Sequence, residues 1–129
     1  MKTFKFIIEK TGTGFSAYAE NFEKTPVTTT GESAEDLRMN ILEALNTWLE
    51  FKGMPLASQE QIKAKLDLPQ FFNYFKEINS KALSKRIQMN ETLLSQYVNG
   101  KKDPSDKQLN RILKGIKELG EELTQVELV

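Results

Sequence analysis

The fold of the second half of this chain is decided by residues 83–105, LSKRIQMNETLLSQYVNGKKDPS. Apolar positions recur here at the spacing of two short helices separated by a tight turn. Such a helix-turn-helix needs a small residue where its helices touch, and Ser84 stands at that place. Its polar residues at the start of the second helix remain free to face outward. The apolar residues that fix the crossing are Leu83, Ile87, Met89, Leu94 and Val98.

Further helical segments are expected around this stretch. The apolar spacing predicts short helices over roughly 81–88 and 91–98. Ser105 and Gln108 form a capping box for a longer helix that is expected to continue to Gly120. The last six residues suit either a terminal strand or a frayed end.

The first third of the chain has the pattern of strands. Phe4, Phe6 and Ile8 recur at every second position, as in a half-buried strand. After a Thr-Gly-Thr-Gly turn, Phe15–Ala19 predicts a second short strand. Val27–Thr30 is rich in β-branched residues and predicts a third. The sequence therefore begins with a hairpin followed by one more strand.

An amphipathic helix is expected after these strands. Ser33 is placed to cap it, with Glu35 and Asp36 in the first turn, where negative charge favours the helix dipole. The helix is expected to end before Gly53, and the alternation over 61–68 predicts a fourth strand. The residues expected to face the sheet are Leu37, Ile41, Leu45 and Trp48.

The predicted fold class is therefore α+β, with two domains. Residues 1–68 form a β-β-β-α-β domain, and residues 69–129 form an all-helical domain that begins at Pro69. The first carries eight basic and ten acidic residues, and the second ten basic and eight acidic. Ten basic residues against four acidic ones lie within 76–117, which indicates either a polyanionic partner or a solvated helical face.

The composition excludes several kinds of active site. Among 129 residues there is no histidine and no cysteine, so a Ser-His-Asp or Cys-His triad, a zinc finger and a disulfide are excluded. The N-terminal apolar stretch stops at Glu9, short of a secretory core of about 7 residues, and nothing approaches the roughly 20 residues of a membrane span. We expect a cytoplasmic protein without a membrane segment.

Residues 69–122 resemble a Cro/repressor-type (XRE-like) helix-turn-helix domain. The resemblance is carried by Tyr97–Ser105, in which a large residue is followed by Asn-Gly, basic residues, Pro and Ser. Gln88 stands where the turn of that family often has glycine, so a strained or altered turn is expected. The resemblance implies binding of double-stranded operator DNA by a dimer or tetramer.

The family pattern also implies roles for individual residues. Thr92, Ser95 and Gln96 would read bases, with Gln96 suited to adenine. Glu91 would either accept a hydrogen bond from cytosine or lower non-specific affinity. The residues that would hold phosphates are Ser80, Lys81, Asn99, Lys101 and Lys102.

The first half is similar to HicB-type antitoxins. Gly14–Tyr18 is a glycine-led aromatic strand, and Thr30–Asn40 contains a Gly-acid-Ser helix start with an Asn one turn later. The family domain is β-β-β-α-β, a reduced ribonuclease-H-like fold. Glu20–Pro26 stands where the family usually has Asp-Leu-Pro-Gly.

This second resemblance implies an antitoxin that neutralises a small, basic, mRNA-cleaving HicA-like toxin and represses its own operon. It implies no catalytic residues, no metal and no cofactor. The acidic balance of residues 1–68 complements a basic toxin. The residues expected to contact the toxin are Tyr18, Glu20, Phe22 and Glu23.

Two other functions remain open from the sequence. A magnesium-dependent ribonuclease would need converging carboxylates. The available ones are Glu9, Glu20, Glu32, Asp36 and Glu43. A stand-alone helix-turn-helix transcriptional regulator would sense a ligand through its N-terminal domain. The residues that could line its pocket are Trp48 with Phe51 and Met39 with Leu42.

Overall fold

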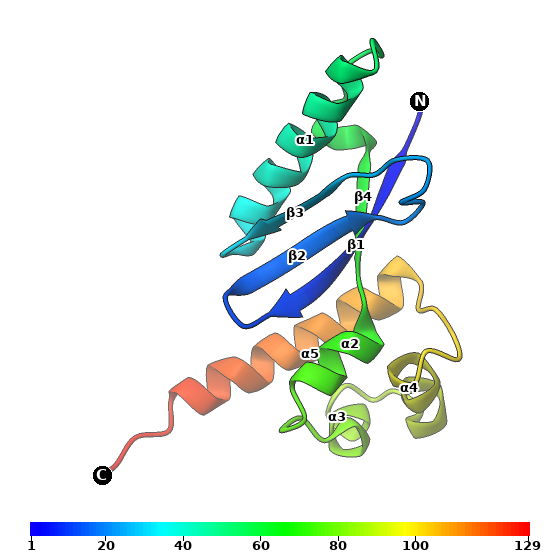
Figure 1. Ribbon diagram of the computed structural model, residues 1–129. Coiled ribbons are helices and arrows are strands. Elements are labelled where there is room, and N and C mark those ends of the chain that lie inside the picture. Colours follow the sequence, from blue (N-terminus) through cyan, green and yellow to red (C-terminus); the bar gives the residue numbers. More distant parts are fainter. The chain divides into compact units, whose positions relative to one another are not determined.

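The computed structural model describes all 129 residues and divides into two compact units, residues 1–74 and 75–129 (Figure 1). It is an α+β protein, as expected, and it contains one four-stranded mixed sheet and five helices. The elements are β1 (Phe4–Thr11), β2 (Gly14–Ala19), β3 (Thr28–Gly31), α1 (Ala34–Phe51), β4 (Ile62–Leu66), α2 (Leu68–Tyr74), α3 (Ser80–Arg86), α4 (Glu91–Val98) and α5 (Asp106–Thr124).

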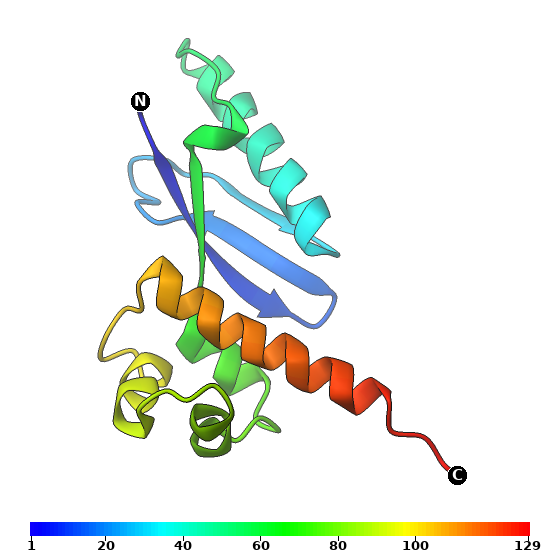
Figure 2. The same cartoon turned by 180° about the vertical axis from the view of Figure 1, so that it is seen from behind.

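Unit 1 is a single sheet covered on one face by α1, which the view from behind also shows (Figure 2). The strand order is β3-β2-β1-β4, in which β1 and β2 pair antiparallel, as do β2 and β3. β4 pairs parallel with β1, because α1 carries the chain back across the sheet. Phe6, Ala17 and Ala19 face α1 and are buried.

α1 begins and packs largely as predicted. The Ser33 side chain caps it by accepting a hydrogen bond from the backbone N–H of Asp36 at 3.1 Å. One expectation is corrected, because Leu49 rather than Trp48 completes the buried stripe, and Trp48 is half-buried at its edge. Position 49 follows Ile41 and Leu45 at intervals of four residues, so it lies on the same buried face of the helix. The buried residues of α1 are Leu37, Ile41, Leu45 and Leu49.

The two glycines of the N-terminal motif stand where the backbone comes closest to itself. Gly14 has a φ of +152°, and a Cβ there would overlap the carbonyl oxygen of Gly31 and lie 2.7 Å from the Cα of Glu32. A Cβ at Gly31 would lie 2.6 Å from the Cα of Leu37. The hairpin and the start of α1 therefore pack together only because both positions lack a side chain.

The junction after β4 corrects the predicted domain boundary. β4 is shorter than the expected strand over 61–68, and α2 begins at once, with Asp67 accepting a hydrogen bond from the Gln70 N–H at 3.1 Å. The Gln70 side chain bonds both the N–H and the C=O of Lys10 at 2.8 Å. α2 is thereby attached to β1, so the boundary lies between Tyr74 and Phe75 rather than at 68/69.

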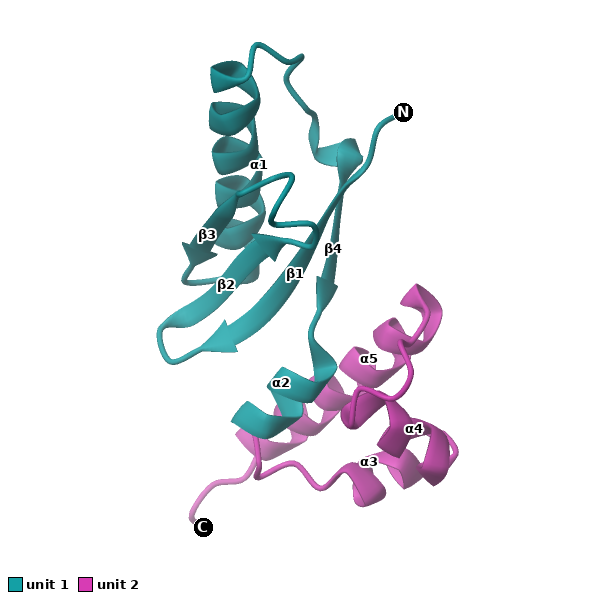
Figure 3. Ribbon diagram, turned by 45° about the vertical axis from the view of Figure 1, so that its right-hand side comes forward, with its two compact units in different colours: residues 1–74 teal, residues 75–129 magenta.

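Unit 2 contains α3, α4 and α5 (Figure 3). Ser84 is 2% exposed, as expected for the small residue where α3 meets its neighbours. On α4, Val98, which was expected to help fix the crossing of the helices, is only half-buried, and Tyr97 beside it is buried. α5 continues past Gly120 to Thr124, and no strand follows it.

Replacing Gly31 with alanine is expected to lower the free energy of unfolding by about 1–3 kcal/mol. The new Cβ would meet backbone atoms of Leu37, which cannot turn aside as a flexible side chain can. Urea unfolding followed by circular dichroism measures the loss. Gly12→Ala is the matched control, since a Cβ there meets nothing within 4 Å. Equal losses in the two variants would contradict this account of the motif.

Candidate functional site

The exposed face of α4 is the main candidate site. Glu91, Thr92, Ser95 and Asn99 are exposed, and Gln96 between them is half-buried. These positions recur at intervals of one, three and four residues, so they share one side of the helix. On the other side of α4, Leu94 and Tyr97 are buried. The structure therefore brings the predicted base-reading residues together on one polar face.

The start of α4 is fixed by Asn90, which the sequence analysis did not single out. Its side chain accepts a hydrogen bond from the backbone N–H of Leu93 at 3.0 Å. Because Asn90 caps the helix, the side chains of Glu91 and Thr92 are not needed for capping, and both residues are exposed. Asparagine directly before a helical stretch is among the strongest N-cap signals, so the sequence did contain this information.

The end of α4 carries two lysines into solvent. Gly100 adopts the left-handed conformation at φ +74° and ends the helix. The carbonyl of Gln96 accepts hydrogen bonds from the N–H groups of Lys101 at 2.8 Å and Lys102 at 3.2 Å. The Asn99 amide donates to the Ser95 hydroxyl at 3.2 Å. Both lysine side chains are exposed directly beyond the polar face of α4.

The remaining predicted phosphate-binding residues lie at the start of α3. Ser80 is half-buried and Lys81 is exposed in the first turn. Asn79 caps this helix by accepting a hydrogen bond from the N–H of Ala82 at 3.0 Å. Since α3 packs directly on α4, the two sets of residues belong to one helix pair.

The turn between α3 and α4 is strained at the position that the sequence marked. Gln88 has a φ of +54° and is the one non-glycine residue of the chain with positive φ. Arg111 of α5 donates to the carbonyl of Ile87 through Nη2 at 2.8 Å and Nε at 3.2 Å, and to the carbonyl of Gln88. The sequence does not single out Arg111, because a basic residue on an amphipathic helix is ordinarily solvated.

A second candidate surface lies in unit 1 around Tyr18. Tyr18 pairs with Ile7 and Thr28 on the neighbouring strands. Since Ala17 and Ala19 point toward α1, Tyr18 lies on the opposite face of the sheet. Burial raises the pKa of the Tyr18 hydroxyl, and the negative charges of Glu9 and Asp67 raise it further.

The other predicted toxin contacts lie in the turn that follows β2. Glu20, Phe22 and Glu23 are all exposed, and Phe22 retains 46% of its surface. The backbone N–H groups of Lys24 and Thr25 both donate to the carbonyl of Asn21, which closes the turn. These three residues share one loop, and Tyr18 lies on the strand that leads into it.

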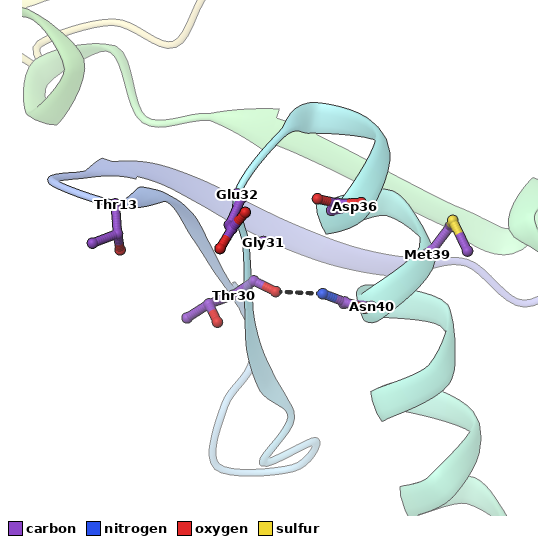
Figure 4. A pocket seen from close by; sticks show the side chains of 7 residues that line it. All are labelled: Thr13, Thr30, Gly31, Glu32, Asp36, Met39 and Asn40. Atoms are coloured by element: carbon purple, nitrogen blue, oxygen red, sulfur yellow. Dashed lines mark hydrogen bonds between the residues drawn. The ribbon is translucent and has the colours of Figure 1, made fainter.

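The acidic residues do not gather at one point. A shallow hollow of about 420 Å³ is lined by Glu32 and Asp36 together with Met39 and Asn40, and the Asn40 amide donates to the carbonyl of Thr30 at 2.7 Å (Figure 4). Glu9 lies on β1 and Glu43 on α1. No group of three or more acidic residues is placed to hold a metal ion.

The residues considered for a ligand pocket are also dispersed. Trp48 packs against the core, whereas Phe51 is 86% exposed at the end of α1. Met39 lines the hollow described above and is 62% exposed. Leu42 is half-buried.

Comparison of the chain with protein-family models, curated proteins and solved structures gives no match. None of the helices combines the length and the apolar content needed to cross a membrane.

Replacing Asn90 with alanine is expected to lower the free energy of unfolding by about 1 kcal/mol, the usual value of an asparagine N-cap. The N–H of Leu93 would lose its side-chain acceptor at the start of the eight-residue α4. Thermal unfolding measures the effect. Asn110→Ala is the matched control, because Asn110 is an exposed interior residue of α5 and alanine favours helix there. A smaller loss at Asn90 than at Asn110 would remove the capping role.

Proposed function

We propose that this chain is a HicB-like antitoxin of the cytoplasm that neutralises a small, basic, mRNA-cleaving HicA-like toxin and represses its own operon. Unit 2 acts as a Cro/repressor-type helix-turn-helix domain, and unit 1 as a reduced ribonuclease-H-like domain that binds the toxin. The observation that carries the proposal is the polar face of α4, bounded by the Asn90 cap and the left-handed Gly100.

The dimensions and chemistry of α4 suit the major groove of DNA. An α-helix with its side chains is about 10–12 Å in diameter, which fits the major groove width of about 12 Å, so the exposed polar face of α4 can reach base edges. Thr92, Ser95 and Gln96 offer hydroxyl and amide groups to base edges, and the amide of Gln96 matches the paired donor and acceptor of adenine. The Glu91 carboxylate either accepts a hydrogen bond from the amino group of a cytosine or weakens non-specific binding to DNA by repelling phosphates.

The surroundings of α4 suit the phosphate backbone. Residues 76–117 carry ten basic side chains against four acidic ones. Lys101 and Lys102 lie beyond the end of α4, while Ser80, Lys81 and Asn99 lie on the α3–α4 pair. Contacts of this kind set register and affinity without reading sequence.

Operator recognition by this domain requires two copies. A dimer related by a two-fold axis places two copies of α4 in successive major grooves, about 34 Å apart along the DNA. A tetramer would bind two such sites. The operator is then expected to be palindromic, because the symmetry of the protein is repeated in its site.

The toxin-binding assignment rests on the chemistry around β2. Tyr18 offers an aromatic ring and a hydroxyl on the sheet face opposite α1, and Phe22 adds a half-exposed ring. Glu20 and Glu23 are exposed in the same loop, and Glu9 lies beside Tyr18. Aromatic anchors with an acidic rim complement a basic, RNA-binding protein.

Two substitutions separate base reading from phosphate binding. Gln96→Ala is expected to lower the preference for the operator over other sequences by about 1–3 kcal/mol, because the bidentate contact to one base is lost. Lys101→Ala is expected to weaken binding to all sequences and to reduce the slope of log K against log salt by about one unit.

Fluorescence anisotropy with operator and scrambled duplexes, at several salt concentrations, measures both effects. Lys52→Ala serves as the control, since Lys52 is an exposed lysine at the end of α1 in unit 1. If Gln96→Ala and Lys101→Ala changed every duplex equally, the assigned roles would be wrong.

The toxin assignment is tested by pull-down of the tagged full chain co-expressed with the small open reading frame beside its gene. A stoichiometric small basic partner that halts growth when expressed alone is expected. The double variant Glu20→Lys with Glu23→Lys should lose capture and protection, because it repels a basic partner. Glu60→Lys, exposed elsewhere in unit 1, should keep both. If no protein partner is captured while the chain still binds operator DNA, the result would instead favour a stand-alone regulator whose first unit senses a ligand.

A further inference from the structure

The angle between α3 and α4 depends on a short and unfavourable turn. Only residues 87–90 separate the two helices, and Gln88 takes a left-handed conformation that glycine would adopt without strain. The turn has some bonds of its own, since the Met89 N–H donates to the carbonyl of Ser84 at 2.9 Å. The carbonyls of Ile87 and Gln88 have no partner within the helix pair itself. Both carbonyls are therefore free to accept hydrogen bonds from a group outside the turn.

One side of α5 supports this turn. Arg111 bonds the carbonyls of both Ile87 and Gln88. Gly115, one turn later, lets Ile87 pack against the α5 backbone, because a Cβ there would overlap the Cγ2 methyl of Ile87. Glu122 forms an ion pair with Arg86, the last residue of α3. The spacings of four and seven residues place all three contacts on one face of α5.

We propose that Arg111 is a positioning residue for operator recognition, which sets the angle of α4 by holding the strained turn. This inference rests on the proposed DNA-binding function. The carbonyls at the end of α3 carry the partial negative charge of a helix C-terminus, which favours a cation. A planar guanidinium reaches both of them at once through fixed N–H groups. A lysine ammonium keeps the charge but lacks this fork.

The competing role for Arg111 is a direct contact to a DNA phosphate. Its side chain is exposed, and the bonds to the turn occupy Nε and one of the two terminal nitrogens. The two roles predict different effects when lysine replaces Arg111. Lysine serves well as a phosphate contact, whereas it cannot hold two carbonyls in the geometry of arginine.

The test compares Arg111→Lys, Gln88→Gly and the double variant in the full chain. Operator affinity is measured over a range of salt, beside a scrambled duplex. Arg111→Lys is expected to weaken operator binding about ten-fold with an unchanged salt slope and little change on the scrambled duplex. Glycine at position 88 removes the strain, so the double variant should recover to within about three-fold of Gln88→Gly alone.

Two results of this test would overturn the positioning role. One is an operator affinity of Arg111→Lys equal to that of the original chain. The other is an operator affinity of the double variant no higher than that of Arg111→Lys. Asn110→Ala is the control on α5, since Asn110 is exposed and uncharged and makes none of these contacts. It should leave operator binding within about two-fold.

Amide hydrogen exchange at residues 87–90, measured without DNA, separates this inference from the proposed function. Faster exchange in Arg111→Lys and its suppression in the double variant are expected if Arg111 holds the turn. A chain that binds no DNA would remove the proposed function while exchange still decided whether the turn is held. Unchanged exchange in Arg111→Lys would overturn the inference by itself.

Discussion

The backbone amides at the start of each helix have no partner within the helix, and meeting this need determines where every helix of the chain begins. A side-chain oxygen meets it in all five cases, through Ser33, Asp67, Asn79, Asn90 and Ser105. The three central helices have only seven or eight residues, too short to be stable alone. The cap and the packing together therefore fix the rotation of each helix about its axis. This rotation decides which residues of α4 face outward.

Local patterns predicted the elements well, because the interactions that form them lie close in sequence. The two serine caps, the order β-β-β-α-β and the bounds of α4 all follow from neighbours within a few residues. The domain boundary did not follow, since it depends on Gln70 bonding to Lys10, 60 residues away. The extension of α5 beyond Gly120 likewise accompanies a bond to Arg86, 36 residues earlier.

The candidate sites divide in the same way. The polar face of α4 was predictable, because helical periodicity alone places residues 91, 92, 95, 96 and 99 on one side. The strain at Gln88 was predictable from the missing glycine. Arg111 was not, because its acceptors are backbone carbonyls, which every residue has and which leave no mark in a sequence. The environment of Tyr18 depends on Asp67, which only the parallel pairing of β4 with β1 brings near.

The half-buried position of Trp48 has a practical consequence. It is the one tryptophan of the chain and packs against the core of unit 1, so its fluorescence reports the folding of that unit. Circular dichroism at 222 nm follows helices in both units, because α1 and α5 are of nearly equal length. Superimposable denaturation curves from the two probes would mean one cooperative transition, and separated curves would resolve two. The unmodified chain thus carries its own spectroscopic label for one half.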